Sequence, residues 1–261
     1  MIDLHSHILP GVDDGAATMD DALEMARAAA AAGIAAVAAT PHVRGGEPIR
    51  AEAMQAGLAE LRRALAGAGV ELEVHGGGEV DLDRLEALPP DELKGFGLGG
   101  NPAYLLVEFP YQGWPLDAPR LLFDLRLAGI TPVLAHPERN AAVQAKPERL
   151  RELVDAGALV QVTAGSLAGR FGSTNRRTAE ALVANGLAHL VASDAHDAGR
   201  RGWDLPAARA AVGDPALARW LVEEMPRAIV ERQPLQPRPA TPKKRRRLSL
   251  TRRGLGALKG A

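Results

Sequence analysis

Short apolar runs alternate along the chain with longer segments in which apolar residues recur every three or four positions. The apolar runs predict seven strands, separated by segments with the period of a helix. The strands are expected near residues 2–7, 34–39, 70–75, 105–109, 131–135, 159–163 and 190–192. Because helices alternate with strands, parallel βα units are predicted, and a closed or nearly closed barrel is favoured over an open doubly wound sheet.

The predicted helices carry recognisable start and stop signals. Thr18 with Asp21 three residues later forms a capping box, and the helix that it begins ends at Gly33. Residues 50–66 form an amphipathic helix with three leucines on one face. The glycine run at residues 76–78 lacks the spacing and the following helix of a nucleotide-binding loop.

Polar side chains that can bind a metal ion end or follow the predicted strands. His5 and His7 are two positions apart, so a strand points both imidazoles to one face. Asp14 follows in a turn before Gly15, where its carboxylate can fold back towards them. In a parallel barrel, functional residues gather at the carboxyl ends of the strands. The candidate ligands are His5, His7, Asp14, His42, Glu79, Glu108, His136, Asp194 and His196.

The residue types in this set indicate divalent metal ions. Imidazole and carboxylate suit zinc, manganese or iron, in contrast to a site built from thiolates. Nine ligands are too many for one tetrahedral ion and fit two or three. Glu79 follows the glycine run and is best placed to bridge two ions. His75 and His189 fall outside this arrangement and are interpreted as structural.

The composition excludes several other kinds of site. The chain of 261 residues contains no cysteine, which removes disulfides, thiolate metal sites and cysteine nucleophiles and fits the cytoplasm. No basic segment precedes Asp3, so the N-terminus does not resemble a signal peptide. The longest apolar run, residues 28–39, is interrupted by Gly33 and is shorter than the roughly 20 residues of a membrane span. We therefore expect a soluble, cytoplasmic protein.

A near-zero net charge of −1 hides an acidic body and a basic C-terminal segment. Eight of the 31 basic residues lie between Lys243 and Lys259, and no acidic residue follows Glu231. Residues 1–234 are predicted to form the folded domain, and residues 235–261 a Pro-rich, then basic, disordered tail. The tail suggests contact with an anionic membrane at its inner face, or a solubilising role. It lacks the interleaved aromatic residues of single-stranded nucleic-acid binders, so nucleic acid is not favoured.

The motifs together resemble the PHP (polymerase and histidinol phosphatase) superfamily. The resemblance rests on His5-Ser6-His7, Thr40-Pro41-His42, Gly78-Glu79, Glu108, His136-Pro137-Glu138-Arg139 and Asp194-Ala195-His196. Within it, Asp13-Asp14-Gly15, residues 164–172 and Ser193 with the Asp-Ala-His motif are similar to the bacterial CpsB/CapC-type tyrosine-protein phosphatases. The match runs from Met1 to about residue 229, and only Thr163 stands where the resemblance leads us to expect asparagine.

This resemblance implies a distorted seven-stranded (β/α) barrel with three metal ions, usually Mn²⁺, with iron or zinc as alternatives. It implies that Arg139 binds substrate phosphate, and that a second arginine does so at Arg200 or Arg201. By position, the three ligand sets would be His5, His7, Glu79 and Asp194; then Glu79, Glu108 and His136; and then Asp14, His42 and His196.

The implied reaction is hydrolysis of phosphotyrosine by a hydroxide generated at the metal ions, without a covalent intermediate. The implied substrate is a phosphotyrosine protein, a bacterial tyrosine kinase of polysaccharide export, in the regulation of capsule or exopolysaccharide synthesis. Three alternatives stay open. One is a PHP phosphatase of a small metabolite such as histidinol phosphate, another is a metal-dependent amidohydrolase, and the third is a non-catalytic docking module that uses the basic tail.

Overall fold

The computed structural model describes residues 1–45 and 48–240. In this part of the chain, nine strands alternate with helices, and every strand pairing is parallel. The strands are β1 (Ile2–Ser6), β2 (Ala36–Ala39), β3 (His42–Val43), β4 (Glu73–Gly76), β5 (Glu79–Asp81), β6 (Tyr104–Glu108), β7 (Thr131–Ala135), β8 (Leu159–Thr163) and β9 (Leu190–Ala192). The α/β class with parallel pairing is thus as predicted.

The strands form two sheets, which differs from the predicted single barrel of seven strands. One sheet has the order β1-β2-β4 and the other the order β3-β5-β6-β7-β8-β9. The count rises to nine because two of the predicted strands are each followed by a further short one, β3 after Thr40 and Pro41, and β5 after Gly77 and Gly78. At β5 the sequence predicted only a turn. Gly78 permits this continuation, since a Cβ there would lie 2.8 Å from the Phe96 ring.

The two sheets meet where β1 passes the end of β9. A parallel bridge joins Ser6 to Ala195, and the amide of His7 donates to the Ala195 carbonyl at 2.8 Å. The amide of Asp194 donates to the carbonyl of His5 at 2.9 Å. The N-terminal strand is therefore fixed directly beside the segment that carries the last predicted ligands.

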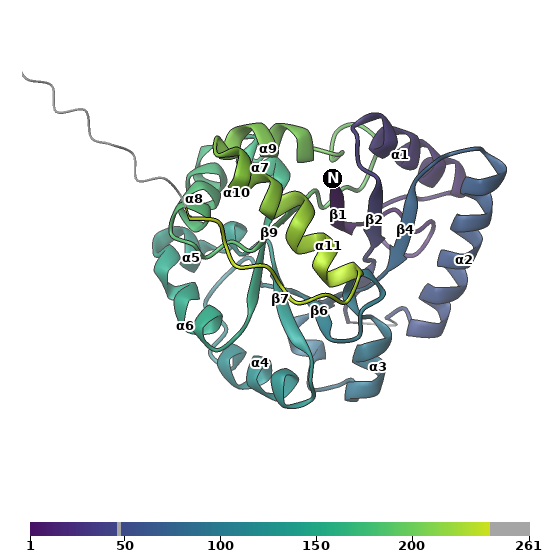
Figure 1. The fold of residues 1–261 in the computed structure, drawn as a ribbon. Helices are drawn as coiled ribbons and strands as arrows, with labels where there is room; N and C mark the ends of the chain where they lie inside the picture. Colours follow the sequence, from purple (N-terminus) through teal and green to yellow (C-terminus); the bar gives the residue numbers. More distant parts are fainter. Residues whose placement is uncertain (46–47, 241–261) are drawn as a thin grey trace, which may run out of the picture.

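Helices cover the outside of the strands (Figure 1). They are α1 (Met19–Ala31), α2 (Ala51–Gly67), α3 (Pro90–Gly95), α4 (Ala118–Leu127), α5 (Ala141–Ala145), α6 (Leu150–Asp155), α7 (Ala164–Leu167), α8 (Ser173–Ala184), α9 (Leu205–Val212), α10 (Pro215–Arg219) and α11 (Met225–Val230). Short 3₁₀ turns are η1 (Leu82–Arg84), η2 (Leu98–Gly100), η3 (Pro137–Arg139) and η4 (Pro147–Arg149), and η5 (Trp220–Glu224) is a π-helix. The predicted capping box of Thr18 and Asp21 begins α1 as expected.

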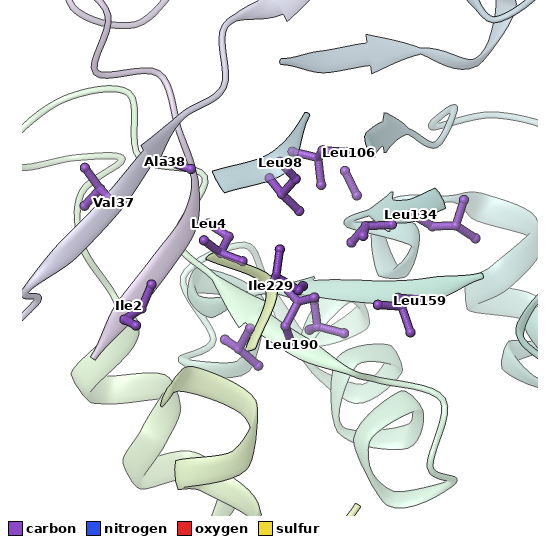
Figure 2. Packing of buried hydrophobic residues seen from close by; sticks show 14 of the residues in the cluster. Ile2, Leu4, Val37, Ala38, Leu98, Leu106, Leu134, Leu159, Leu190 and Ile229 are labelled. Atoms are coloured by element: carbon purple, nitrogen blue, oxygen red, sulfur yellow. The ribbon is translucent and has the colours of Figure 1, made fainter. Parts of the chain in front are cut away.

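The core lies between the strands and is closed at one end by α11. Leu4, Leu98, Leu190 and Ile229 pack together there, as Figure 2 shows, and all four are fully buried. Asn101 fixes this helix by donating from its side-chain amide to the Ile229 carbonyl at 2.7 Å. Because Asn101 precedes β6, α11 covers the amino ends of the strands and leaves their carboxyl ends for the polar cluster.

The chain after α11 returns along the body of the protein. Leu235 packs against the core, and the Trp220 indole donates to the Gln236 carbonyl at 3.0 Å. Arg238 donates to the carbonyls of Val183 and Ala188. The rest of the predicted tail, residues 241–261, lies outside the described residues. Within the described part, no helix is long and apolar enough to cross a membrane.

Candidate metal centre

The nine predicted ligands gather at the carboxyl ends of the strands. Their donor atoms form four overlapping groups, and within each group the atoms lie within 4.8 Å of one another. The groups are His7, Asp14, His42 and His196; His5, Glu79 and His136; His5, His7 and Asp194; and His42, Glu79 and Glu108. All nine residues predicted from the sequence therefore belong to one cluster.

Glu79 lies at the centre of this cluster and is fully buried. Its Oε2 is 3.2 Å from Nε2 of His5 and 3.1 Å from Nδ1 of His42, and its Oε1 is 2.8 Å from Nε2 of His136. Burial alone would raise the pKa of Glu79, but His5, His136 and His7 hold that pKa well below its usual value. A carboxylate that belongs to two of the four ligand groups has the placement expected of a bridge between ions.

Glu108 has a more peripheral position than the sequence implied. Its Oε2 is 3.5 Å from Nδ1 of His42, it shares one group with His42 and Glu79, and its side chain is more exposed than that of Glu79. The group that contains His136 is completed by His5 instead. The structure thus associates Glu108 with His42, whereas the resemblance grouped it with His136.

Hydrogen bonds of Nδ1 orient the rings of His5, in β1, and of His7, which directly follows it. Asp13 Oδ2 accepts from Nδ1 of His7 at 2.7 Å, and Gln161 Oε1 accepts from Nδ1 of His5 at 3.0 Å. With Nδ1 donating in this way, Nε2 of each ring is left to act as a metal ligand. Sequence reasoning missed both partners as site residues. Asp13 could have been found from its place beside Asp14, but Gln161 lies 156 residues from His5 and carries no local signal.

Several donor atoms of the ligand residues are suited to cations and make no hydrogen bond. Within the described residues, Oε2 of Glu79, Nδ1 of His42, Nδ1 of His136 and Nε2 of His196 are buried and make no hydrogen bond. Such atoms are costly unless another group satisfies them, and a bound divalent ion would do so. The residues present therefore fit a metal centre.

Protons on the histidines can also compensate the negative charge of the clustered carboxylates. Burial would lower the pKa of His7, but its bonds to Asp13, Asp194 and Glu79 raise that pKa well above the usual value. The pKa of His5 is also raised, because the attraction of Glu79 and Asp194 exceeds the opposing effect of burial. Metal uptake must displace these protons, so affinity is expected to weaken as the pH falls.

Two arginines lie beside the ligands, on the side of Asp194. Arg139 Nη2 is 2.7 Å and Arg201 Nη2 is 3.3 Å from Oδ2 of Asp194, whose Oδ1 faces His5 and His7. Both arginines line a cavity of about 630 Å³. Arg200, the alternative to Arg201, is exposed, and its carbonyl accepts from Arg170 away from the ligands. The geometry thus distinguishes the two neighbouring arginines.

The segment around residues 164–172 contacts both Arg139 and its neighbour Glu138. Glu138, next to Arg139, is fully buried, and its Oε1 accepts from the Thr163 amide at 3.0 Å and from the Ser166 hydroxyl at 2.8 Å. The Phe171 ring lies 4.7 Å from Cζ of Arg139, in the geometry of a cation–π contact. The carboxylate of Glu138 is directed towards α7 and does not pair with the neighbouring Arg139. The acidic partner of Arg139 is therefore Asp194.

Comparison with known proteins places this chain in a family. The family model for capsular polysaccharide synthesis, CpsB/CapC, matches residues 1–220. The tyrosine-protein phosphatase YwqE of Bacillus subtilis is 40% identical over 212 residues, which cover 78% of this chain and 80% of the relative. The tyrosine-protein phosphatase CpsB of Streptococcus agalactiae is 30% identical over 209 residues, which cover 76% of this chain and 83% of the relative.

A solved structure agrees with these relatives. It comes from work on YwqE from Bacillus subtilis and CpsB from Streptococcus pneumoniae, described as unique metal-dependent tyrosine phosphatases. Its TM-score with this chain is 0.84 at 35% sequence identity, with 93% of this chain and 100% of the other covered. The similarity therefore extends over the whole fold as well as the ligand motifs.

Proposed function

The chain belongs to the CpsB/CapC family of capsular polysaccharide synthesis, and from this premise we propose that it is a metal-dependent protein-tyrosine phosphatase. The observation that carries the proposal is the contact of Asp194 with both parts of the site. One of its oxygens faces the histidine ligands, and the other faces Arg139 and Arg201. Cation ligands and anion-binding arginines in direct contact are what hydrolysis of a phosphate monoester requires.

We propose that the nine clustered residues hold three divalent ions, Mn²⁺ by preference, with iron or zinc as alternatives. Four overlapping ligand groups and a central Glu79 support more than one ion. Ions bound there would supply the positive charge that activates water and stabilises phosphoryl oxygens. The absence of soft thiolate or thioether donors favours manganese.

The chain's own residues bind and orient the substrate. Arg139 and Arg201 present guanidinium groups to the cavity of about 630 Å³, where they would receive the phosphate. The stacked Phe171 and the contact with Asp194 hold Arg139 in place before substrate arrives. No cysteine is available as a nucleophile, so the thiol route of other tyrosine phosphatases is excluded.

We also propose that the fold is a distorted seven-stranded barrel of the PHP type. In this interpretation, β2 with β3 and β4 with β5 are two interrupted strands, and the bridge from Ser6 to Ala195 joins the remaining edges. The barrel domain would extend over residues 1–234, and the segment that follows packs against it through Leu235 and Arg238. Its carboxyl-end face, where all nine ligands gather, would then be the single active face, as in other parallel barrels.

The proposed substrate is a phosphotyrosine protein, and we propose a tyrosine kinase of polysaccharide export as the partner; the match to a family of capsular polysaccharide synthesis supports a role in that process. A cytoplasmic location follows from that partner. The anionic-membrane contact of the basic tail stays a prediction from the sequence, because residues 241–261 lie outside the described residues. Unchanged co-sedimentation with anionic vesicles after truncation at Ala240 would exclude that contact.

The function is tested by comparing substrates with and without metal. The protein is loaded with Mn²⁺ and assayed for phosphate release from a phosphotyrosine peptide and from histidinol phosphate, and for hydrolysis of a cyclic amide. We expect turnover of the peptide to be the fastest and to stop after chelation. Faster turnover of histidinol phosphate or of the amide would replace the proposal by the corresponding alternative.

A further inference from the structure

We propose that Tyr111 is the specificity-determining residue that selects aromatic phosphate esters. This inference rests on the proposed function and deepens it. Tyr111 lies in the loop between β6 and α4 and stands beside the metal centre, although it offers no metal ligand. Its contacts, its exposed surface and the way its loop is held together carry the argument.

Tyr111 lies between a metal ligand and a phosphate-binding arginine. Its ring is stacked on that of His136, with centroids 5.7 Å apart and planes inclined by 4°. Its hydroxyl accepts from Nη1 of Arg139 at 3.5 Å. Tyr111 is nevertheless 45% exposed and lines two cavities, so part of its surface is accessible to a ligand. An ester whose phosphate binds Arg139 would therefore place its first substituent against this ring.

The loop that carries Tyr111 is tied to the segment of Arg139. Asn140, the next residue, is buried, and its side-chain amide donates to the carbonyls of Pro110 at 2.6 Å and Gly113 at 2.7 Å. The amide of Ala141 donates to the carbonyl of Tyr111 at 3.0 Å. The aromatic ring and the guanidinium are thus held at a fixed separation, which reduces the entropic cost of binding a ligand that spans both.

The two cavities that Tyr111 lines differ in character. The cavity of about 630 Å³ contains Arg139 and Arg201. Tyr111 also lines a cavity of about 550 Å³, where most of the lining surface is apolar, from residues such as Leu82 and Leu121. Charged residues line this second cavity too, namely Arg44, Asp81, Asp83, Glu108 and Asp117. The ring therefore stands at the boundary between the cavity of the two arginines and the more apolar one. A phenyl ester matches that boundary, whereas an alkyl ester has no ring to stack.

The closing experiment measures recognition of the ring without turnover. Calorimetry on the Mn²⁺-loaded protein compares the affinities of phenylphosphonate and methylphosphonate for wild type, Tyr111→Leu and Tyr111→Phe. We expect Tyr111→Leu to reduce the preference for phenylphosphonate by about three- to tenfold, the range of one aromatic pair. Tyr111→Phe should keep the preference, because it keeps the ring. The KM for a phosphotyrosine peptide should rise in Tyr111→Leu by a similar factor.

Phe123→Leu is the matched control, because Phe123 is an exposed aromatic residue on α4 that lines neither cavity. Its phosphonate preference should equal that of wild type. An unchanged preference in Tyr111→Leu would overturn the inference. So would equal weakening of both phosphonates with loss of metal, since the ring would then only support His136. An aryl preference that depends on Tyr111, without phosphate release from phosphotyrosine, would contradict the proposed function alone.

Discussion

Two ligand residues have backbone conformations that are uncommon for residues other than glycine. His136 has a φ of 39° and Asp194 a φ of 56°, both in the left-handed region. Each follows the end of a strand, and the amide of His136 donates to the carbonyl of Gln161 at 2.9 Å. Such strain persists only where surrounding contacts impose it, and it concentrates at functional sites. Here His136 contacts Glu79, and Asp194 contacts Arg139 and Arg201.

The sequence predicted the ligands better than the residues that support them. The nine ligands could be found because each histidine or carboxylate ends or follows a strand. Asp13 could have been found, because it lies beside Asp14 and six residues from His7, but Gln161 could not be assigned, because its hydrogen bond depends on the approach of a distant segment. Arg200 and Arg201 could not be separated, because adjacent residues in a loop follow no period that fixes their direction.

The contacts of Arg139 and Arg201 with Asp194, which Arg200 lacks among the described residues, give a prediction. Arg201→Ala should lower kcat/KM for a phosphotyrosine peptide by about tenfold or more, the scale of a lost charge-assisted hydrogen bond. Arg139→Ala should lower it by about 10²-fold, since Arg139 is preorganised by Phe171. Arg139→Lys should recover only part of the loss, because an ammonium lacks the planar fork.

Arg200→Ala is the control for this series, because Arg200 is exposed and it is Arg201 that contacts Asp194. Its kinetics should match those of wild type, and metal content should be unchanged in all four variants. A large effect of Arg200→Ala, or metal loss in Arg139→Ala with full activity per bound ion, would show that the arginine roles are wrongly assigned.

The turn after β1 positions both the ligand that precedes it, His7, and the ligand within it, Asp14. The amide of Ala16 donates to the carbonyl of His7 at 3.0 Å, so the turn folds back directly onto the strand end. A Cβ on Gly15 would lie 2.0 Å from that same carbonyl oxygen. Only glycine allows this approach, which holds Asp13 against His7 and Asp14 near His42.

Gly15→Ala should therefore disturb the metal centre as well as the fold. We expect the free energy of unfolding to fall by about 1–3 kcal/mol, the usual cost of forcing extra volume into a packed position. Metal content should fall with it. Denaturant unfolding and elemental analysis measure the two effects. Gly67→Ala is the control, because a Cβ on this residue near the end of α2 meets nothing within 4 Å. Equal behaviour of both variants would contradict the account of the turn.

At the scale of the whole molecule, alternation of strands and helices predicted the α/β class, but the number and grouping of strands could not be predicted. The division into two sheets depends on the interruptions at Thr40–Pro41 and Gly77–Gly78. Nothing in the apolar pattern reveals these, because β3 and β5 have only two and three residues. The position of the loop that carries Tyr111 could not be predicted either, because it depends on hydrogen bonds from the buried Asn140 of a later segment.

The central claim is that Glu79 unites the ligands into one centre on which phosphotyrosine hydrolysis depends. It is tested most directly by measuring metal content and phosphotyrosine-peptide turnover together after Mn²⁺ loading, in wild type, Glu79→Gln and Glu108→Gln. Glu79→Gln should lose more than one ion and reduce turnover by about 10²-fold or more, since the bound ions contribute several kcal/mol. Glu108→Gln, which alters a peripheral ligand, should lose at most one ion and retain more activity. Equal, mild effects of the two changes, or full turnover in a metal-free preparation, would contradict the account.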